Sequence, residues 1–344
     1  MNKGRRKVTI SDVAREAGVA KMTVSRVVNG GNYVRAELQK RVRQAIAKLS
    51  YQPNEAARIM SGHKARTIGL IVPNLGDTFF ATCANAVQES AARHGYMVLI
   101  QASARNSEVE ASAIKMMVSR NVAGLILIPM EVTASAELVE AQAAGMPIVI
   151  LDRPVNGLKT SEVMVDNVRG AEKAVRHLIE HGHTQIACLG YDAKFSSIRQ
   201  RIEGYIKAMK DHELNPQVWK ADSPKGFRGL LERRLNSTQL PTALFTLNNV
   251  TTIQTLYTIQ EKGIRIPKEI ALAGFDDLEL ASLLSVPVTA VCQSASELGC
   301  AGAKLLFDAI RSEVSPKDGA ITKLILPTEL VIRNSCGCNG GNGV

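Results

Sequence analysis

Residues 8–29, VTISDVAREAGVAKMTVSRVVN, carry the pattern of two short helices joined by a glycine turn. Thr9, followed three residues later by Asp12, resembles a capping box and predicts a helix start. Gly18 breaks this first helix, and a second helix is predicted from residue 21 to residue 29. Small apolar side chains recur at helical spacing and are expected to face inward: Val13, Ala14 and Ala17 in the first helix, and Val24, Val27 and Val28 in the second.

A third helix is predicted from residue 35 to residue 50. Leu38, Val42, Ile46 and Leu49 recur at helical spacing there and would close a three-helix core. A short helix, a tight glycine turn and a second helix are typical of the helix-turn-helix motif. We therefore expect an all-α head at the N-terminus.

Positive charge is concentrated in the same region. The 344-residue chain has a formal net charge of +10, from 42 Lys and Arg against 32 Asp and Glu. Residues 1–66 hold 15 Lys and Arg against 4 Asp and Glu, a net charge of +11, whereas residues 67–344 hold 27 against 28, a net charge of −1. A basic segment with a helical apolar pattern is typical of nucleic-acid binding and differs from a disordered basic tail.

The motif at 8–29, together with YQPNEAAR at 51–58, resembles the DNA-binding head of the lactose/galactose-repressor (LacI/GalR) family of bacterial regulators. The resemblance continues through most of the remaining chain. It implies that the second helix enters the major groove, where Lys21, Met22 and Arg26 take the family's base-reading positions. Lys and Arg can donate to guanine O6 and N7, while Met can pack against base edges or a thymine methyl group.

Further DNA contacts implied by the resemblance lie along the head, at Thr9, Thr23, Ser25, Asn29 and Tyr51. Hydroxyl and amide groups suit phosphate contacts, which position a helix without reading sequence. Ordinary polarity of a helix surface is the alternative explanation for Thr23 and Ser25. Ala20 departs from the family pattern, which usually has Ser or Thr there to cap the recognition helix, so this helix start should be weaker by roughly 1 kcal/mol.

Residues 53–60 resemble the hinge helix of the family. Pro53 fits the first helical position, and Asn54, Ala57 and Met60 share one face at i, i+3 and i+6. In the family, this helix folds on DNA, pairs with its dimer mate and wedges an apolar residue, usually Leu, into the minor groove; Met60 takes that place here. An ordinary linker is the alternative. We expect a head at 1–61 that includes the hinge helix, and a linker at 62–66.

Residues 67–344 alternate apolar runs with amphipathic segments, which predicts repeated βα units and parallel, doubly wound sheets covered on both faces. Strands are predicted at 68–72, 96–101, 124–128, 148–151, 186–189, 242–246, 270–273 and 323–326, all of them buried. Helices are predicted at 78–94, 107–120, 134–144, 168–181, 196–212, 226–236, 249–262 and 295–312. The resemblance implies a periplasmic-binding-protein-like body of two subdomains around a cleft, for effector binding and dimerisation. It places the chain crossings near 165–167, 291 and 326.

Ligands of open α/β sheets bind beyond the carboxyl ends of the strands, so polar residues after predicted strands are candidates for an effector site. The predicted effector-binding residues are Asp77, Phe79, Phe80, Arg153, Arg201, Asn248 and Asp276. Carboxylate and amide groups suit sugar hydroxyls, and Arg adds grip on a hydroxyl or a carboxylate.

Roles are predicted for these side chains. Asp276 and Asn248 are assigned to ligand hydroxyls, Phe79 or Phe80 to an apolar lid, and Arg153 is a weaker candidate that could bind a carboxylate. Arg201 matches the ligand-binding arginine of the family and is assigned as the anchor. The family commonly has Asn-Asp where this chain has Asn-Asn at 248–249, so the identity of the ligand does not transfer directly. The alternative for each Asp is helix N-capping, which fits Asp77, Asp166 and Asp277 well.

Enzyme motifs are not found in the sequence: it has no Walker P-loop, Gly-x-Ser-x-Gly elbow or His-Glu-x-x-His pair. His177, His181 and His183 cluster near a predicted helix end, where a favourable dipole placement explains them better than a metal. Cys336 and Cys338 could bind metal or form a strained disulfide, but we expect a frayed, Gly-rich tail in which they have no role. The six cysteines are expected to be reduced and mostly buried. We expect no cofactor and no metal.

Two functions remain open. The first is a DNA-binding transcription regulator, most simply a repressor, that works as a cytoplasmic homodimer on near-palindromic operator DNA under control of a sugar, sugar acid or related effector. The second is a sugar-binding or catalytic module with an incidental basic head. No apolar run approaches the roughly 20 residues that span a bilayer, so no membrane partner is expected. Sequence-selective binding of duplex DNA would separate the two functions.

Overall fold

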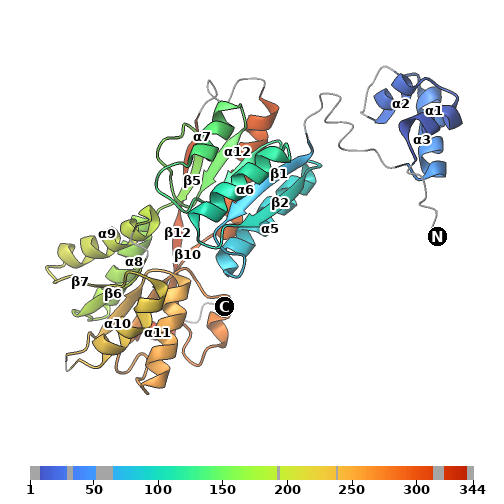
Figure 1. Cartoon of the computed structure of the whole chain (residues 1–344). Coiled ribbons are helices and arrows are strands. Elements are labelled where there is room, and N and C mark those ends of the chain that lie inside the picture. Colours follow the sequence, from blue (N-terminus) through green and yellow to red (C-terminus); the bar gives the residue numbers. More distant parts are fainter. Residues whose placement is uncertain are drawn as a thin grey trace, which may run out of the picture. The chain divides into compact units, whose positions relative to one another are not determined.

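The computed structural model describes residues 8–28, 34–51, 65–191, 194–237, 239–312 and 321–338. The chain divides into two compact units, Met1–Ala65 and Arg66–Val344, which we call the head and the body (Figure 1). Each unit is described by itself.

The head is a three-helix unit made of α1 (Ile10–Ala17), α2 (Lys21–Val28) and α3 (Ala36–Leu49). The predicted capping interaction is present, because the Thr9 N–H donates to the Asp12 carboxylate at 3.0 Å. Gly18 adopts a φ of +61°, which favours glycine at the turn between α1 and α2. The small core of the head consists of six buried side chains: Val13, Ala14, Ala17, Val24, Val42 and Ala45. The predicted helix-turn-helix arrangement is therefore confirmed.

The body contains two six-stranded sheets, which define a first and a second lobe. The first sheet has the order β11-β5-β4-β3-β1-β2, and its strands are β1 (Thr67–Val72), β2 (Met97–Ala102), β3 (Leu125–Leu127), β4 (Ile148–Leu151), β5 (Ser161–Val165) and β11 (Lys323–Leu326). The second has the order β12-β10-β9-β8-β6-β7, and its strands are β6 (Ile186–Gly190), β7 (Gln217–Lys220), β8 (Ala243–Thr246), β9 (Ala271–Phe275), β10 (Thr289–Gln293) and β12 (Thr328–Val331). Strand pairs are parallel except β10–β12, which is antiparallel.

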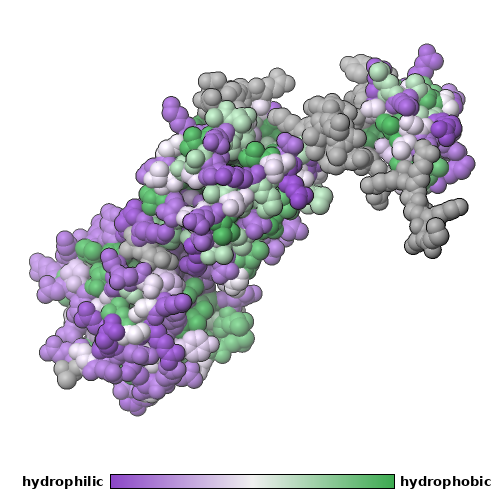
Figure 2. Space-filling view, in the orientation of Figure 1, coloured by the Kyte–Doolittle hydropathy of each residue, from purple (hydrophilic) through white to green (hydrophobic). Residues whose placement is uncertain are grey.

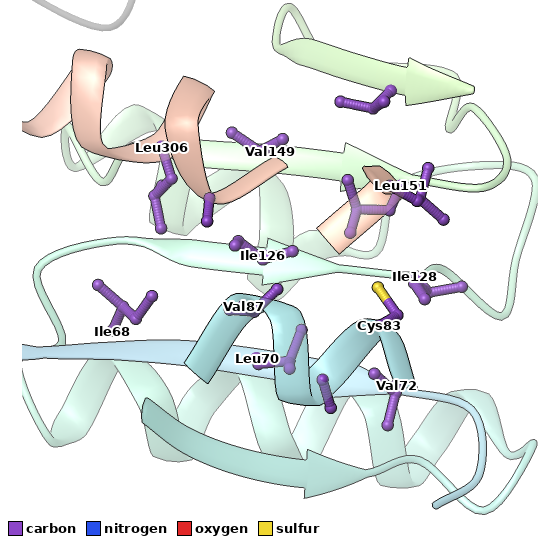
Figure 3. Packing of buried hydrophobic residues seen from close by; sticks show 14 of the residues in the cluster. Ile68, Leu70, Val72, Cys83, Val87, Ile126, Ile128, Val149, Leu151 and Leu306 are labelled. Carbon is purple, nitrogen blue, oxygen red and sulfur yellow. The ribbon is translucent and has the colours of Figure 1, made fainter. Parts of the chain in front are cut away.

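Helices cover the two faces of each sheet. Those of the first lobe are α5 (Thr78–Arg93), α6 (Ser107–Ser119), α7 (Ala136–Ala143) and α12 (Ala295–Arg311). Those of the second are α8 (Asn167–Glu180), α9 (Ser196–Asp211), α10 (Pro224–Leu235) and α11 (Asn249–Glu261). Alternate residues of β1 face opposite layers: Leu70 packs with α5 and α12 (Figure 3), while Ile71 packs with α6 and α7. This alternation explains the continuously apolar sequence of the central strands.

The chain crosses between the lobes three times, close to the predicted points. It leaves β5 of the first lobe at 165–167 to begin α8 of the second. It returns after β10, so that α12 packs in the first lobe, and crosses again between β11 and β12. The fold class is therefore confirmed: an all-α helix-turn-helix head and a doubly wound α/β body.

Some strand predictions differ from the structure. The strands β5, β7, β10 and β12 were not predicted; β7 and β12 are edge strands with polar residues, and β5 is short and begins with two polar residues, Ser161 and Glu162. The predicted strands β2 and β11 are present but are not buried: Met97 of β2 is 74% exposed and Ile325 of β11 is 65% exposed. Both β11 and β2 lie at edges of the first sheet, which leaves one side of each strand without a neighbour.

The end of the described chain also differs from prediction. The short 3₁₀ turn η2 (Asn334–Cys336) packs against the second sheet instead of fraying, and Ser335 and Cys336 are fully buried. Ser335 Oγ donates to the Leu272 carbonyl oxygen at 2.5 Å and accepts from the Thr289 N–H at 2.8 Å. Among the six cysteines, which are all unpaired, Cys83, Cys188 and Cys336 are buried and Cys300 is exposed.

The surface of the body is largely hydrophilic on one face. On the face shown in Figure 2, hydrophilic residues cover most of the second lobe, at the lower left. Within the described residues, helices long and apolar enough to cross a bilayer are not found.

One glycine in each lobe allows two helices to pack closely. A Cβ on Gly299 of α12 would lie 2.5 Å from the Cys83 carbonyl oxygen of α5, and one on Gly204 of α9 would overlap the Val168 carbonyl oxygen of α8. We expect Gly299→Ala and Gly204→Ala each to lower the free energy of unfolding by about 1–3 kcal/mol, because the clash is with backbone. Urea denaturation followed by circular dichroism measures the loss.

Gly229→Ala is the matched control. A Cβ at Gly229 in α10 would meet only the end of the Arg233 side chain, at an ordinary 3.6 Å. Because Ala favours helix, this change should leave stability unchanged or raise it by up to about 1 kcal/mol. Equal effects of all three substitutions would contradict the close-packing argument.

Candidate functional site

A pocket lies between the two lobes of the body, beyond the carboxyl ends of the central strands. It is lined by all seven predicted effector-binding residues: Asp77, Phe79, Phe80, Arg153, Arg201, Asn248 and Asp276. Nine further residues line it: Pro73, Arg105, Met130, Asp152, Phe195, Ser197, Ile198, Asn249 and Gln293. Residues scattered over more than two hundred positions of sequence therefore meet at one site, because parallel strands end at the same edge of a sheet.

Arg201 is the most constrained side chain of the pocket. It is 3% exposed, and its guanidinium lies over the Phe275 ring at 3.7 Å from the ring centroid. Its Nε donates to Asn167 Oδ1 at 2.8 Å, and its Nη1 donates to the Leu247 carbonyl oxygen at 2.7 Å and to Asp276 Oδ2 at 3.1 Å. A buried charge needs such partners, so Arg201 is held in one orientation.

Asp276 is buried at the end of β9 and joins Arg201 to the strand β10. Its other oxygen accepts from Gln293 Nε2 at 2.5 Å. Burial raises the pKa of the Asp276 carboxyl, and Asp152 adds to the rise, while the positive charge of Arg201 opposes it. The carboxylate therefore depends on Arg201 for its ionised state, and both oxygens are already held by side chains that a ligand hydroxyl could join or replace.

The first lobe contributes a related pair. Asp152 follows β4 as Asp276 follows β9, and the two backbones share the left-handed region, with φ values of +67° and +66°. Arg153 donates to the Asp152 carboxylate at 2.7 Å and lies over the Phe195 ring at 4.1 Å from the centroid. Because Phe195 belongs to the second lobe, this cation–π contact joins the two walls of the pocket.

Two further polar contacts connect the lobes. Asn249 Nδ2 donates to Asp77 Oδ1 at 2.8 Å, and Lys194 Nζ lies 3.3 Å from Glu131 Oε1. The lobes of the body are thus closed on one another. Such hydrogen bonds contribute about 0.5–1.5 kcal/mol each, and exposed ion pairs contribute less, so the closed arrangement rests on several weak contacts.

The helix-capping alternative holds for several of the Asp and Asn residues without removing them from the pocket. Asp77 Oδ1 accepts from the Phe79 N–H at the start of α5, and Asn248 Oδ1 accepts from the Thr251 N–H at the start of α11. Both nevertheless line the pocket. Asp166 caps α8, while Asp277 holds Arg333 through two hydrogen bonds of 2.7 Å.

Gln293 and Phe195 were missed by sequence reasoning for different reasons. Gln293 ends β10, a strand that the apolar pattern did not predict. Phe195 precedes α9 instead of following a strand, so the rule about strand ends does not find it. The only sign in the sequence was that Phe195 is an aromatic residue close to Arg201, six positions before it.

The head presents the predicted base-reading residues to solvent. Lys21, Met22 and Arg26 are exposed, Met22 at 65%, while Val24 on the opposite side of α2 is buried in the head core. The three side chains recur on one face, as contact with a groove requires.

The remaining predicted DNA contacts are placed less uniformly. Thr23 and Ser25 are half-buried, Thr9 is exposed, with Oγ1 donating to the Asp12 carboxylate at 2.7 Å, and Tyr51 packs partly against the head core. The predicted contacts Asn29, Asn54, Ala57 and Met60, with the hinge helix at 53–60, lie outside the described residues.

Comparisons with known proteins agree with both units. The family model for bacterial regulatory proteins of the lacI family matches residues 9–54, and a periplasmic binding protein-like domain matches residues 175–336. The chain is 32% identical over 332 residues to the HTH-type transcriptional repressor PurR of Pasteurella multocida, covering 95% of this chain and 98% of that one. The chain belongs to the LacI family. The ribose operon repressor of Haemophilus influenzae is 29% identical over the same coverage.

Solved structures of transcription regulators are similar over nearly the whole chain. The lac repressor dimer bound to operator and the anti-inducer ONPF has a TM-score of 0.83 and 27% identity, covering 96% of this chain and 99% of that one. The complex of the transcriptional regulator CelR with cellobiose has a TM-score of 0.69 and 26% identity, covering 96% and 100%. These family members are regulators of transcription, which supports a regulator and not an enzyme.

Glu110 lies next to the pocket, and its raised pKa predicts how the stability of the chain depends on pH. Its Oε2 accepts from the N–H of the pocket residue Met130 at 2.8 Å, and burial, more than the nearby Glu131, raises the pKa of Glu110 to about 7. A raised acid pKa favours folding below the ordinary value near 4.5, and this contribution is lost as the pH rises through about 7. Relative to Glu110→Gln, the native chain should lose about 3 kcal/mol between these pH values and then level off.

Chemical denaturation across this pH range measures the difference, since Gln keeps the acceptor for the Met130 N–H. The exposed Glu89→Gln is the control and should follow the native chain at every pH. A pH-independent gap between the native chain and Glu110→Gln would contradict the assigned cause.

Proposed function

We propose that this LacI-family regulator is a cytoplasmic, homodimeric repressor whose affinity for near-palindromic operator DNA is controlled by a neutral, polyhydroxylated ligand bound between the lobes of the body. The observation that carries the ligand class is the set of paired charges in the pocket. The proposal narrows the sequence-based expectation of a sugar or sugar acid to a neutral sugar.

Each arginine in the pocket has a carboxylate beside it. Arg153 lies 2.7 Å from Asp152, Arg201 lies 3.1 Å from Asp276, and Arg105 lies 3.8 Å from Asp77. An anionic ligand would meet three neutralised cations and three carboxylates, so it would gain little from charge. A sugar, by contrast, can donate hydroxyl protons to the carboxylates and accept from the guanidinium groups and from Gln293.

Aromatic walls favour the same class of ligand. Phe79, Phe80 and Phe195 line the pocket beside these polar groups. The C–H face of a sugar ring packs on an aromatic ring, while the sugar hydroxyls point to the polar side chains. Small-molecule sites commonly combine an apolar, aromatic lining with a few polar groups that orient the ligand. A ribose operon repressor and a cellobiose complex among the relatives support this chemistry.

DNA binding follows from α2 and the basic head. Lys21, Met22 and Arg26 form the exposed face of α2, and residues 1–66 carry a net charge of +11 against −1 for the rest. A single small head makes few contacts, so two heads in a dimer would read two half-sites. The lac repressor, which is similar over the whole chain, was solved as a dimer on its operator.

Coupling between ligand and DNA would pass through the linkers of the dimer. We expect the ligand to bias the lobes between closed and open arrangements, change the spacing of the two linkers and so favour or disfavour the hinge helices. The head residues Thr9, Thr23, Ser25, Asn29 and Tyr51 would position the recognition helix, and Asn54, Ala57 and Met60 would act through the hinge helix.

A ligand screen tests the effector class. Thermal unfolding of the full chain is measured with neutral pentoses, hexoses and disaccharides, and with sugar acids and nucleobases; a neutral sugar should raise the melting temperature by mass action.

The substitution Phe195→Leu should weaken the binding of that sugar by about fivefold to tenfold, because ring packing is lost. Phe227→Leu, buried in a different core, is the control and should keep the affinity. A response to sugar acids or nucleobases alone would refute the neutral-ligand assignment.

A DNA selection experiment tests the recognition helix. Arg26→Ala should relax the preference at one base pair of each half-site by about 1–3 kcal/mol, because a guanidinium that reads a base edge is lost. Arg43→Ala, on the exposed side of α3, is the matched control and should keep the base preference. If Arg26→Ala keeps the native preference while total affinity falls, Arg26 contacts phosphate and the base-reading assignment is wrong.

A further inference from the structure

The C-terminal turn brings two cysteines against the end of helix α8. Cys336 Sγ lies 3.3 Å from His177 Nε2, and Cys338 Sγ lies 3.5 Å from the same nitrogen. The ring of His181, one helical turn after His177, lies beside that of His177 in a tilted arrangement, with the two ring centroids 4.3 Å apart. His177 therefore has three further groups with nitrogen or sulfur donor atoms around it, two of them about 160 residues away in sequence.

We propose that His177, His181 and Cys338, completed by Cys336, form a binding site for a thiophilic divalent cation of the Zn²⁺ class. Donor atoms of His177, His181 and Cys338 all lie within 4.8 Å of one another. A tetrahedral zinc ion with bonds of about 2.3 Å to sulfur and about 2.0–2.1 Å to nitrogen holds these atoms roughly 3.5 Å apart. The 3.5 Å between Cys338 and His177 matches this span.

His181 is oriented as a metal ligand requires. His181 Nδ1 lies 2.7 Å from the His177 carbonyl oxygen, so Nδ1 donates the proton and Nε2 keeps its lone pair. A carbonyl partner on the second ring nitrogen is the usual outer support of a metal-bound histidine. Both histidines lie at the C-terminal end of α8, where the partial negative charge of the helix favours a cation.

The site is anchored on one side and open on the other. Cys336 is fully buried in the core formed with α8 and α9, and its carbonyl oxygen lies 3.4 Å from His183 Nε2. His181 is exposed and Cys338 is partly exposed, which gives an ion a path from solvent. A buried Cys–His hydrogen bond alone would involve only His177 and Cys336, and it does not account for Cys338 Sγ, which lies 3.5 Å from the same nitrogen of His177.

The two donor types select the ion. Two thiolates and two imidazoles suit Zn²⁺, whereas Mg²⁺ and Ca²⁺ require oxygen ligands. A bound ion would fasten the turn η2 to α8, whose other end carries Asn167, the partner of Arg201 in the pocket. We therefore expect the ion to stabilise the second lobe.

Metal titration of the full chain tests the site. Chain stripped with EDTA and kept reduced is titrated with Zn²⁺ against a chromophoric chelator, and we expect one ion per chain with a Kd below about 1 μM. Co²⁺ in its place should give thiolate-to-metal charge transfer and the intense visible bands of a tetrahedral site. Zn²⁺ should also raise the melting temperature of the native chain.

Surface variants provide the decisive comparison. His181→Gln and Cys338→Ser change accessible side chains, and each should weaken Zn²⁺ by at least about tenfold. His212→Gln is a matched control, because His212 also ends a helix with Nδ1 2.8 Å from the carbonyl oxygen four residues before it, and Cys300→Ser controls for an exposed thiol. The controls should bind as the native chain does.

Three results would overturn the proposal: Zn²⁺ retention no stronger than that of the doubly substituted His181→Gln, Cys338→Ser chain, a Co²⁺ spectrum without the thiolate band, or equal losses in the two control variants. Circular dichroism of each variant confirms that the fold is retained.

Discussion

The burial of one positive charge, that of Arg201, organises the body. A guanidinium removed from water must be matched by acceptors and an opposite charge, or the fold loses several kcal/mol. The acceptors come from three places: Asn167 begins α8 just after the first chain crossing, Leu247 follows β8, and Asp276 follows β9. Gln293, at the second crossing, holds the other oxygen of Asp276. Two of the three segments that join the lobes are therefore tied to the charged pair in the pocket.

The two lobes have similar arrangements of charged residues around the pocket. Each places an Asp with a left-handed backbone at the end of a central strand, and each pairs it with an arginine. Each also packs one helix pair at very short range through a glycine, Gly299 in the first lobe and Gly204 in the second. Closely packed layers deform little, so relative movement of the lobes is concentrated in the crossings. The pocket lies between these two closely packed lobes.

The sequence predicts this arrangement where the pattern is local and misses it where the partners are distant. The helices of the head and body follow from periodicity and caps, and Asp77, Asp276 and Asn248 follow from their place after apolar strands. The strands β7 and β12 were not predicted because they are edge strands with polar residues. Because β10 was not predicted either, Gln293 at its end was not recognised as a pocket residue. Arg201 lies inside a helix, and its partners are 34, 46 and 75 residues away, so only the family resemblance singled it out. The convergence of Cys336 and Cys338 on His177 was missed for the same reason: a glycine-rich end of chain gives no local sign that it packs into a core.

The balance of charges constrains how a ligand can control this protein. An effector shifts two arrangements only by the difference between its affinities for them. Among the described residues, polar contacts between the lobes join Asn249 with Asp77, Arg153 with Phe195 and Lys194 with Glu131. Each of these contacts is weak, so a difference of a few kcal/mol is enough to change the population. A neutral ligand can provide it through hydrogen bonds shared between Asp152 in one wall and Asp276 in the other, without adding charge to a pocket whose charges already cancel. By linkage, DNA must then alter ligand affinity by the same factor, so the basic head and the nearly neutral body form one thermodynamic system.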